Sequence, residues 1–142
     1  MITSNNSTAK IILIVDDDED DRALFRDALK EVDDSIKCLS AVDGEDALKQ
    51  LGKRTDLPDY IFLDLNMPRL NGIQCLASIR KDKKLNNIHV IIYSTSQRPE
   101  DISEAKKLGA SLFVTKPALF KKICKTISSV LAMDDSQFAF SA

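Results

Sequence analysis

Acidic and other polar side chains stand at the ends of the apolar segments of this chain. A run of six acids, residues 16–21, follows the first apolar segment directly. The third apolar segment contains the carboxylate Asp64, and the fourth ends in the hydroxyl of Ser94. The amine of Lys116 follows the fifth. Burying a lone carboxylate such as Asp64 is costly unless a cation pairs with it. We therefore expect a shared site in which a cation lies beside a carboxylate.

A cluster of carboxylates needs a counter-charge. Two unit charges about 4 Å apart interact by about 4 kcal/mol at an effective dielectric of about 20, so three clustered carboxylates do not all stay ionised unaided. Hard oxygen ligands with room for water suit Mg²⁺. If Asp16, Asp17 and Asp64 are ionised, Mg²⁺ and the ammonium of Lys116 neutralise them. An anionic phosphoryl group could then approach a carboxylate nucleophile in this neutral site.

Apolar periodicity predicts the elements that position these residues. Five short runs are nearly all apolar, which is typical of parallel strands covered on both faces: 11–15, 36–42, 60–65, 90–94 and 111–114. A helical pattern follows each run. Asp18 and Pro99 stand where helices begin, and Gly52 and Gly109 where helices end. Five successive strand–helix units predict an α/β fold with a parallel sheet.

Ligands of open α/β sheets bind outside the carboxyl ends of the strands. We therefore expect one edge of the sheet to gather the acids after the first strand with Asp64, Ser94 and Lys116. The single histidine, His89, begins the fourth apolar segment, five residues before Ser94. At ~3.3 Å per residue it lies about 16 Å from Ser94. We predict a surface histidine outside the site.

Composition narrows the class of protein. With 142 residues, 44% hydrophobic and 30% charged, the chain is typical of one globular domain. A net charge of −2 offers no broad attraction to DNA or to an anionic membrane. No apolar run approaches the ~20 residues of a membrane span, and the opening residues lack the pattern of a secretory signal. Three scattered cysteines fit neither a disulfide framework nor a zinc site, which favours the cytoplasm.

Three regions are predicted along the chain. Residues 1–8 form a disordered polar lead, residues 9–133 the folded domain, and residues 134–142 a short tail without an output domain. The tail carries Phe138 and Phe140. We interpret it as a frayed end, with a docking peptide as the alternative.

Over residues 9–133 the chain resembles the receiver domains of two-component response regulators. The resemblance rests on VDDD after the first strand, FLDLNMPRLNG around Asp64, IIYSTS around Ser94 and LFVTKP with Lys116. The intervals of 30 and 22 residues between these three positions are similar to the family's spacing. The resemblance implies a flavodoxin-like (CheY-like) (βα)5 doubly wound parallel sheet of strand order 2-1-3-4-5. The run STSQRPEDI is also similar to stand-alone receivers that include partners of bacterial phytochromes.

The resemblance implies a phosphoacceptor and a metal site. Asp64 would accept a phosphoryl group from a phosphohistidine. Mg²⁺ would be bound by Asp16, Asp17, Asp64 and the backbone carbonyl of Asn66. Asp18 is expected to cap a helix instead of binding the metal.

The resemblance also implies a switch. Lys116, followed by Pro117, would pair with the carboxylate and then with a phosphoryl oxygen. Ser94 would swing toward the phosphoryl group, and Phe113 would follow it inward as the switch aromatic; an ordinary core residue is the alternative for Phe113.

Three positions bear on how long a phosphoryl group would last. Thr95 stands where the family usually has a smaller residue, so it is expected to narrow access to Asp64. Asn66 and Ser96 occupy positions that tune autodephosphorylation in the family. These residues are expected to modulate the site.

The implied function is that of a single-domain response regulator. Its partners would be a sensor histidine kinase or histidine phosphotransfer protein and a downstream protein target, with a homodimer possible in addition. It would act in the cytoplasm, bind neither DNA nor membrane, and catalyse only its own phosphorylation and autodephosphorylation.

Four other interpretations compete. A receiver-like scaffold would bind partners without phosphorylation, and a small Mg²⁺-dependent phosphatase would also use an aspartate nucleophile. An EF-hand is excluded by Asp21, where glycine is required, and by Asp27, where glutamate is expected. A flavodoxin would bind phosphate in its first loop, which six acids would repel.

Overall fold

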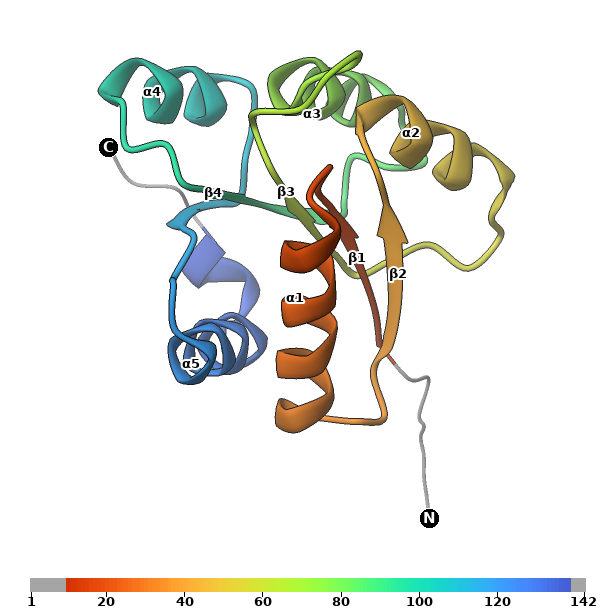
Figure 1. Ribbon diagram of the computed structural model, residues 1–142. Helices are drawn as coiled ribbons and strands as arrows, with labels where there is room; N and C mark the ends of the chain where they lie inside the picture. The colour runs from red at the N-terminus through yellow and green to blue at the C-terminus, as the bar shows by residue number, and fades with distance from the viewer. Residues whose placement is uncertain (1–9, 139–142) are drawn as a thin grey trace.

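The structure, a computed structural model, describes residues 10–138 and contains a five-stranded parallel sheet with helices on both faces (Figure 1). The predictions for residues 1–8 and for Phe140 lie outside the described residues. The strands are β1 (Ile11–Val15), β2 (Lys37–Ala41), β3 (Tyr60–Leu63), β4 (His89–Ser94) and β5 (Leu112–Thr115). All neighbours pair in parallel in the order β2-β1-β3-β4-β5. The predicted fold class and strand order are confirmed.

Within the described residues the helices are α1 (Glu19–Val32), α2 (Gly44–Lys53), α3 (Gly72–Lys81), α4 (Pro99–Lys107), α5 (Phe120–Leu131) and the short 3₁₀ helix η2 (Asp135–Phe138). Helices α1 and α5 cover one face of the sheet, and α2, α3 and α4 cover the other (Figure 1). No helix within residues 10–138 has the length and apolar character needed to cross a bilayer.

The apolar strands form two cores, one on each face of the sheet. Along β1, Ile12 and Ile14 pack toward α1 and α5, whereas Leu13 and Val15 pack toward α2 and α3. Successive residues of a strand point to opposite faces, so a central strand covered on both sides is apolar throughout.

The predicted helix boundaries are mostly confirmed. Asp18 caps α1, since its side chain accepts hydrogen bonds from the N–H groups of Asp20 and Asp21. Pro99 begins α4, and Gly109, with φ of +93°, follows the end of that helix. The predicted stop at Gly52 is wrong, because α2 continues to Lys53. A glycine lowers helix propensity but keeps its backbone N–H, so a single one does not end a helix.

The prediction of a frayed tail is wrong for residues 135–138. These residues form η2, in which Phe138 is buried. The ring of Phe138 stacks on the ring of His89 with a centroid distance of 4.0 Å, and His89 Nε2 lies 3.1 Å from Asp135 Oδ1. His89 does lie at the far end of β4 from Ser94, but it is half-buried beneath the tail.

Candidate functional site

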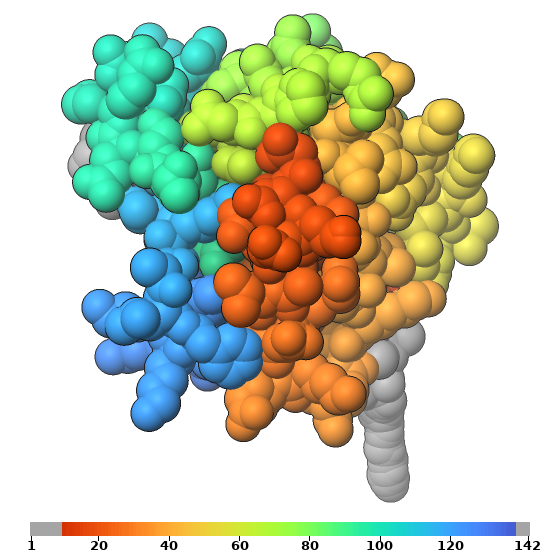
Figure 2. Space-filling view, in the orientation of Figure 1, coloured from red at the N-terminus to blue at the C-terminus, as the bar shows by residue number. Residues whose placement is uncertain are grey.

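Four parallel strands deliver their terminal polar residues to one edge of the sheet. Backbone hydrogen bonds extend the sheet past the strand ends: Asp64 N–H donates to Val15 O at 3.0 Å, and Lys116 N–H donates to Ser94 O at 2.9 Å. In Figure 2 the chain that follows β1 (red-orange) bulges at the centre of the view, bordered by the yellow-green β3–α3 connection and by blue residues near the start of α5. The sheet itself therefore fixes the spacing of the site residues.

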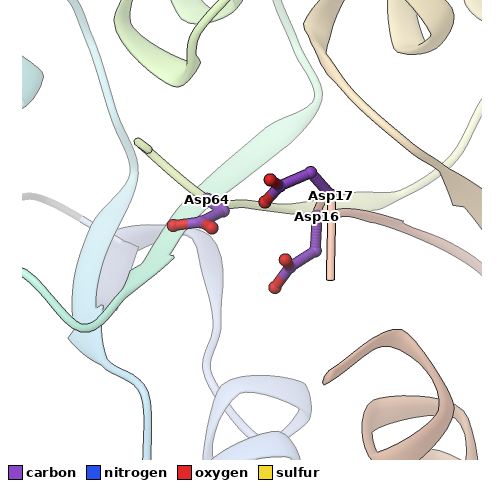
Figure 3. A group of neighbouring side chains, drawn as sticks. All are labelled: Asp16, Asp17 and Asp64. Atoms are coloured by element: carbon purple, nitrogen blue, oxygen red, sulfur yellow. The ribbon is translucent and has the colours of Figure 1, made fainter. Parts of the chain in front are cut away.

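Asp16, Asp17 and Asp64 form a candidate metal centre. One carboxylate oxygen from each lies within 4.8 Å of the others (Figure 3). Asp16 and Asp64 are buried, at 1% and 7% exposure, and Asp17 is exposed. Asp16 Oδ1 accepts a hydrogen bond from Asp18 N–H at 2.9 Å, whereas its buried Oδ2 has no hydrogen-bond partner of good geometry among the described residues. Three hard carboxylate oxygens at this spacing fit a divalent cation such as Mg²⁺.

The ammonium of Lys116 is shared among three carboxylates. Its Nζ lies 2.6 Å from Asp16 Oδ2, 2.8 Å from Asp21 Oδ2 and 3.6 Å from Asp64 Oδ2. Sequence reasoning missed Asp21. The available signal was its place in the first turn of α1, three residues after the cap Asp18. With Asp21 included, the balance of three carboxylates against Mg²⁺ and one amine is wrong, because the site then carries a net charge of −1.

Burial and the charge of Lys116 shift the pKa values of the site residues in opposite directions. Burial raises the pKa of Asp16, and the nearby ammonium of Lys116 only partly opposes it. Burial also raises the pKa of Asp64, against the opposing charge of Lys116 and hydrogen bonds from Asn66 N–H and Ser94. For Lys116, burial lowers the pKa, but hydrogen bonds to Asp16 and Asp21 and the charge of Asp64 reverse this and leave it raised. The buried acids are thus under-compensated, which favours an added cation.

The loop after β4 joins the site to α4. Ser94 is fully buried, and its Oγ accepts a hydrogen bond from Ser96 N–H at 3.3 Å. Ser96 Oγ in turn donates to Asp101 Oδ2 at 2.5 Å in the first turn of α4. Thr95, the residue after Ser94, is exposed. These hydrogen bonds connect Ser94 to the start of α4.

The remaining predicted residues surround the centre. Phe113 in β5 is half-buried against the core beneath α2, α3 and α4, beside Ile92 of β4. Asn66 is exposed, and its N–H donates to Asp64 Oδ1 at 3.4 Å. Pro117 is half-buried next to Lys116. Of these residues Asn66 contacts Asp64 directly, and the roles of all three stay predictions.

An ion pair and a backbone hydrogen bond hold the loop 64–72 in place, and the sequence analysis did not predict either of them. Asp43, the cap of α2, is buried and forms an ion pair with the exposed Arg69, whose φ of +58° is rare outside glycine. Gly44 N–H donates to Leu70 O at 3.0 Å, and a Cβ on Gly72 would lie 2.3 Å from Asp64 O. The two glycines let α2 and α3 approach the loop that begins with Asp64.

The fold and the acidic site define a receiver domain. The model of the response regulator receiver domain family matches residues 12–128, which is most of the chain. The chain therefore belongs to the response regulator receiver domain family.

Two curated relatives match over part of their length. Protein PilH of Pseudomonas aeruginosa is 38% identical over 79 residues, which cover 56% of this chain and 65% of PilH. Chemotaxis protein CheY of Treponema pallidum is 34% identical over 92 residues, which cover 65% of this chain and 62% of CheY. The chain thus spans slightly less than two thirds of the length of these relatives.

Solved structures of similar fold include response regulators of phytochromes. The phosphorylated cyanobacterial phytochrome response regulator RcpA superimposes with a TM-score of 0.81 at 29% identity, covering 87% of this chain and 91% of that chain. The Mn²⁺-bound form of response regulator Rcp1 gives a TM-score of 0.76 at 27% identity, with coverages of 87% and 93%. The predicted likeness to phytochrome response regulators is confirmed.

Proposed function

We propose that this chain is a response regulator receiver that is phosphorylated on Asp64 by a sensor histidine kinase or a histidine phosphotransfer protein. The convergence of Asp16, Asp17, Asp64 and Lys116 supports this proposal. A carboxylate oxygen of Asp64 attacks the phosphorus of the phosphohistidine. A new P–O bond forms, the P–N bond breaks, and its electron pair leaves with the imidazole nitrogen, which takes up a proton.

Mg²⁺ is the proposed cofactor. Asp16, Asp17, Asp64 and the backbone carbonyl of Asn66 would hold it. The bound ion would neutralise developing charge and orient the phosphoryl oxygens. The burial of Asp16 and Asp64 beside Asp17, with Lys116 as their shared cation, and the raised pKa values of Asp16 and Asp64 favour such an ion.

Phosphorylation would act as a switch because it changes the local charge. A carboxylate of charge −1 becomes a phosphorylated group of charge about −2. Lys116 and Ser94 then donate charge-assisted hydrogen bonds to the phosphoryl oxygens. Ser94 is linked through Ser96 and Asp101 to α4, and Phe113 lies beneath that helix. A changed outer face then binds a downstream protein or a second copy of the chain.

Labelling by acetyl phosphate tests this function directly, because the small phosphodonor takes the place of the kinase. We expect wild-type protein with Mg²⁺ to gain one phosphoryl group per chain by intact-mass spectrometry, and protein with excess chelator to gain none. Asp64→Asn abolishes labelling because the nucleophile is lost. Asp56→Asn serves as the control, because Asp56 is an exposed acid before β3.

The outcomes separate the competing functions. Full labelling of Asp64→Asn contradicts the assignment of the nucleophile. A wild-type protein that is never labelled but still binds partners is the phosphorylation-independent scaffold. Continuous release of phosphate from varied phosphomonoesters would indicate a phosphatase.

A further inference from the structure

Asp21 contacts Lys116 in a way that the proposed phosphotransfer does not require. Its Oδ2 accepts a hydrogen bond from Lys116 Nζ at 2.8 Å, whereas Asp64 Oδ2 lies 3.6 Å from the same atom. Hydrogen bonds from nitrogen to oxygen span about 2.7–3.2 Å. The amine is therefore engaged by Asp16 and Asp21 and lies just out of hydrogen-bonding reach of the proposed phosphoacceptor.

The first turn of α1 fixes Asp21 in place. Asp18 Oδ1 accepts hydrogen bonds from Asp20 N–H at 2.9 Å and from Asp21 N–H at 3.3 Å. Arg22 Nη1 donates to the backbone oxygen of Asp16 at 2.7 Å, which ties the same turn to the end of β1. The Asp21 side chain is 37% exposed, whereas that of Lys116 is 10% exposed. Asp21 thus holds the amine from the solvent side.

We propose that Asp21 is a positioning residue that competes with Asp64 and its phosphoryl group for the ammonium of Lys116. This inference rests on the proposed function. Two effects of the Asp21 carboxylate act in the same direction: it retains the amine, and its negative charge repels an incoming phosphoryl group. Asp21 therefore favours the unphosphorylated form and sets how readily Asp64 holds a phosphoryl group.

Binding of beryllofluoride, a mimic of the phosphoryl group, tests this competition. Isothermal titration calorimetry with saturating Mg²⁺ compares wild-type protein with Asp21→Asn, Asp21→Glu and Asp20→Asn. Asp20 is a matched control, since it lies in the same turn and carries the same charge but is exposed and outside the ion pairs of Lys116. We expect Asp21→Asn to bind on the order of tenfold more tightly than wild type. Asp20→Asn and the conservative Asp21→Glu stay within about twofold of it.

The crystal structure of metal-free Asp21→Asn provides a second measurement that does not depend on the mimic. We expect Lys116 Nζ to move within about 2.7–3.2 Å of Asp64. An amine that stays near 3.6 Å, or equal beryllofluoride affinities of Asp21→Asn and Asp20→Asn, overturns the role of Asp21. Failure of wild-type protein to bind beryllofluoride at all contradicts the proposed function instead, and the crystal structure then still decides where Asp21 holds the amine.

Discussion

At the scale of single residues, the site contains more buried negative charge than its one amine compensates. Asp16 and Asp64 are buried, Asp17 and Asp21 lie beside them, and Lys116 is the cation that contacts three of the four. Such an arrangement is unfavourable for the metal-free fold and favourable for binding a cation. The stability of this protein and its chemistry are therefore linked through the same side chains.

Lys116→Met is expected to destabilise the metal-free protein by about 3–5 kcal/mol, because it leaves Asp16 and Asp64 buried without a partner. Asp64→Asn is not expected to destabilise the metal-free protein. Burial raises the pKa of Asp64 in the folded state, so burying its charge opposes folding, and a neutral amide leaves stability unchanged or higher. Urea unfolding followed by circular dichroism measures both. Equal losses in the two variants would contradict this account of the charges.

Asp43 predicts a pH dependence away from the proposed metal centre. The N–H of Asp46 and then the guanidinium of Arg69 hold the pKa of Asp43 below its ordinary value of 3.8. A lowered folded-state pKa contributes stability above the unfolded-state value, and this contribution is lost as the pH falls through the folded-state pKa. Asp43→Asn keeps a capping oxygen but loses the charge that pairs with Arg69. It is therefore expected to be less stable than wild type at pH 7. The difference in the free energy of unfolding between the two proteins, measured by urea unfolding, closes only below pH 3.8. A difference that persists in acid would mean that packing, and not the charge of Asp43, causes it.

Residue types predicted the site well but not its internal pairing. The positions of Asp64, Ser94 and Lys116 after apolar strands predict that they meet, because parallel strands place their carboxyl ends at one edge. The ion pair between Asp21 and Lys116 depends on how α1 is rotated relative to β5, which Lys116 follows directly. These two elements are distant in the sequence. The place of Asp21 three residues after the cap Asp18 was the available signal, but it does not show which acid of that turn faces Lys116.

At the scale of elements, the loop between β3 and α3 controls where Asp64 lies. A Cβ at position 72 would lie 2.3 Å from Asp64 O and 2.7 Å from Leu65 Cα, both backbone atoms. Contacts below 3.0 Å force a shift of the backbone. The approach of α3 to this loop therefore requires glycine at position 72.

Gly72→Ala is expected to destabilise the protein by about 1–3 kcal/mol through this overpacking. Gly52→Ala is the matched control, because a Cβ there meets no atom of the described residues within 4 Å and the position lies inside α2. It is expected to stabilise the protein by about 0.5–1 kcal/mol. Thermal unfolding measures both, and a neutral Gly72→Ala would show that the loop adapts freely.

Helix η2 covers the opposite end of the sheet from the site. Phe138 stacks on His89 and lies 6.2 Å, ring to ring, from Tyr60. These contacts join the tail to the amino ends of β3 and β4. The apolar pattern of the sequence did not predict that η2 covers this end, because a four-residue 3₁₀ helix is too short to show a periodicity.

Phe138→Ala is expected to lower the free energy of unfolding by about 2–3 kcal/mol, since it removes a buried aromatic ring. Leu119→Ala is the control, because Leu119 is 61% exposed and its replacement is expected to cost no more than about 0.5 kcal/mol. Chemical denaturation of both variants measures the difference. Equal small effects would show that η2 does not stabilise the domain.

At the scale of the whole molecule, the candidate site and helix η2 lie at opposite ends of the sheet. The carboxyl ends of β1, β3, β4 and β5 carry the acids, Ser94 and Lys116, and the amino ends of β3 and β4 lie beneath η2. The order of the strands, the two helical layers and the location of the site were all predicted. The helical layers and the location of the site depend on local periodicity and on general rules of α/β topology, whereas the strand order was implied by the resemblance to receiver domains. The contacts of Asp43, Arg69, Asp21 and Phe138 depend on side-chain geometry between distant segments, which a single sequence does not contain.

The most direct test of the account is a nuclear magnetic resonance titration of backbone amides, first with Mg²⁺ and then with beryllofluoride. The account predicts saturable shifts at one equivalent of Mg²⁺ for Asp17, Asp64 and Asn66, followed by shifts through Ser94, Ser96 and Phe113 when the phosphoryl mimic binds. Residues around His89 and Phe138 stay unchanged. Shifts confined to other regions, or shifts at the acidic site that persist unaltered in Asp64→Asn, would contradict a phosphoryl switch built on Asp64.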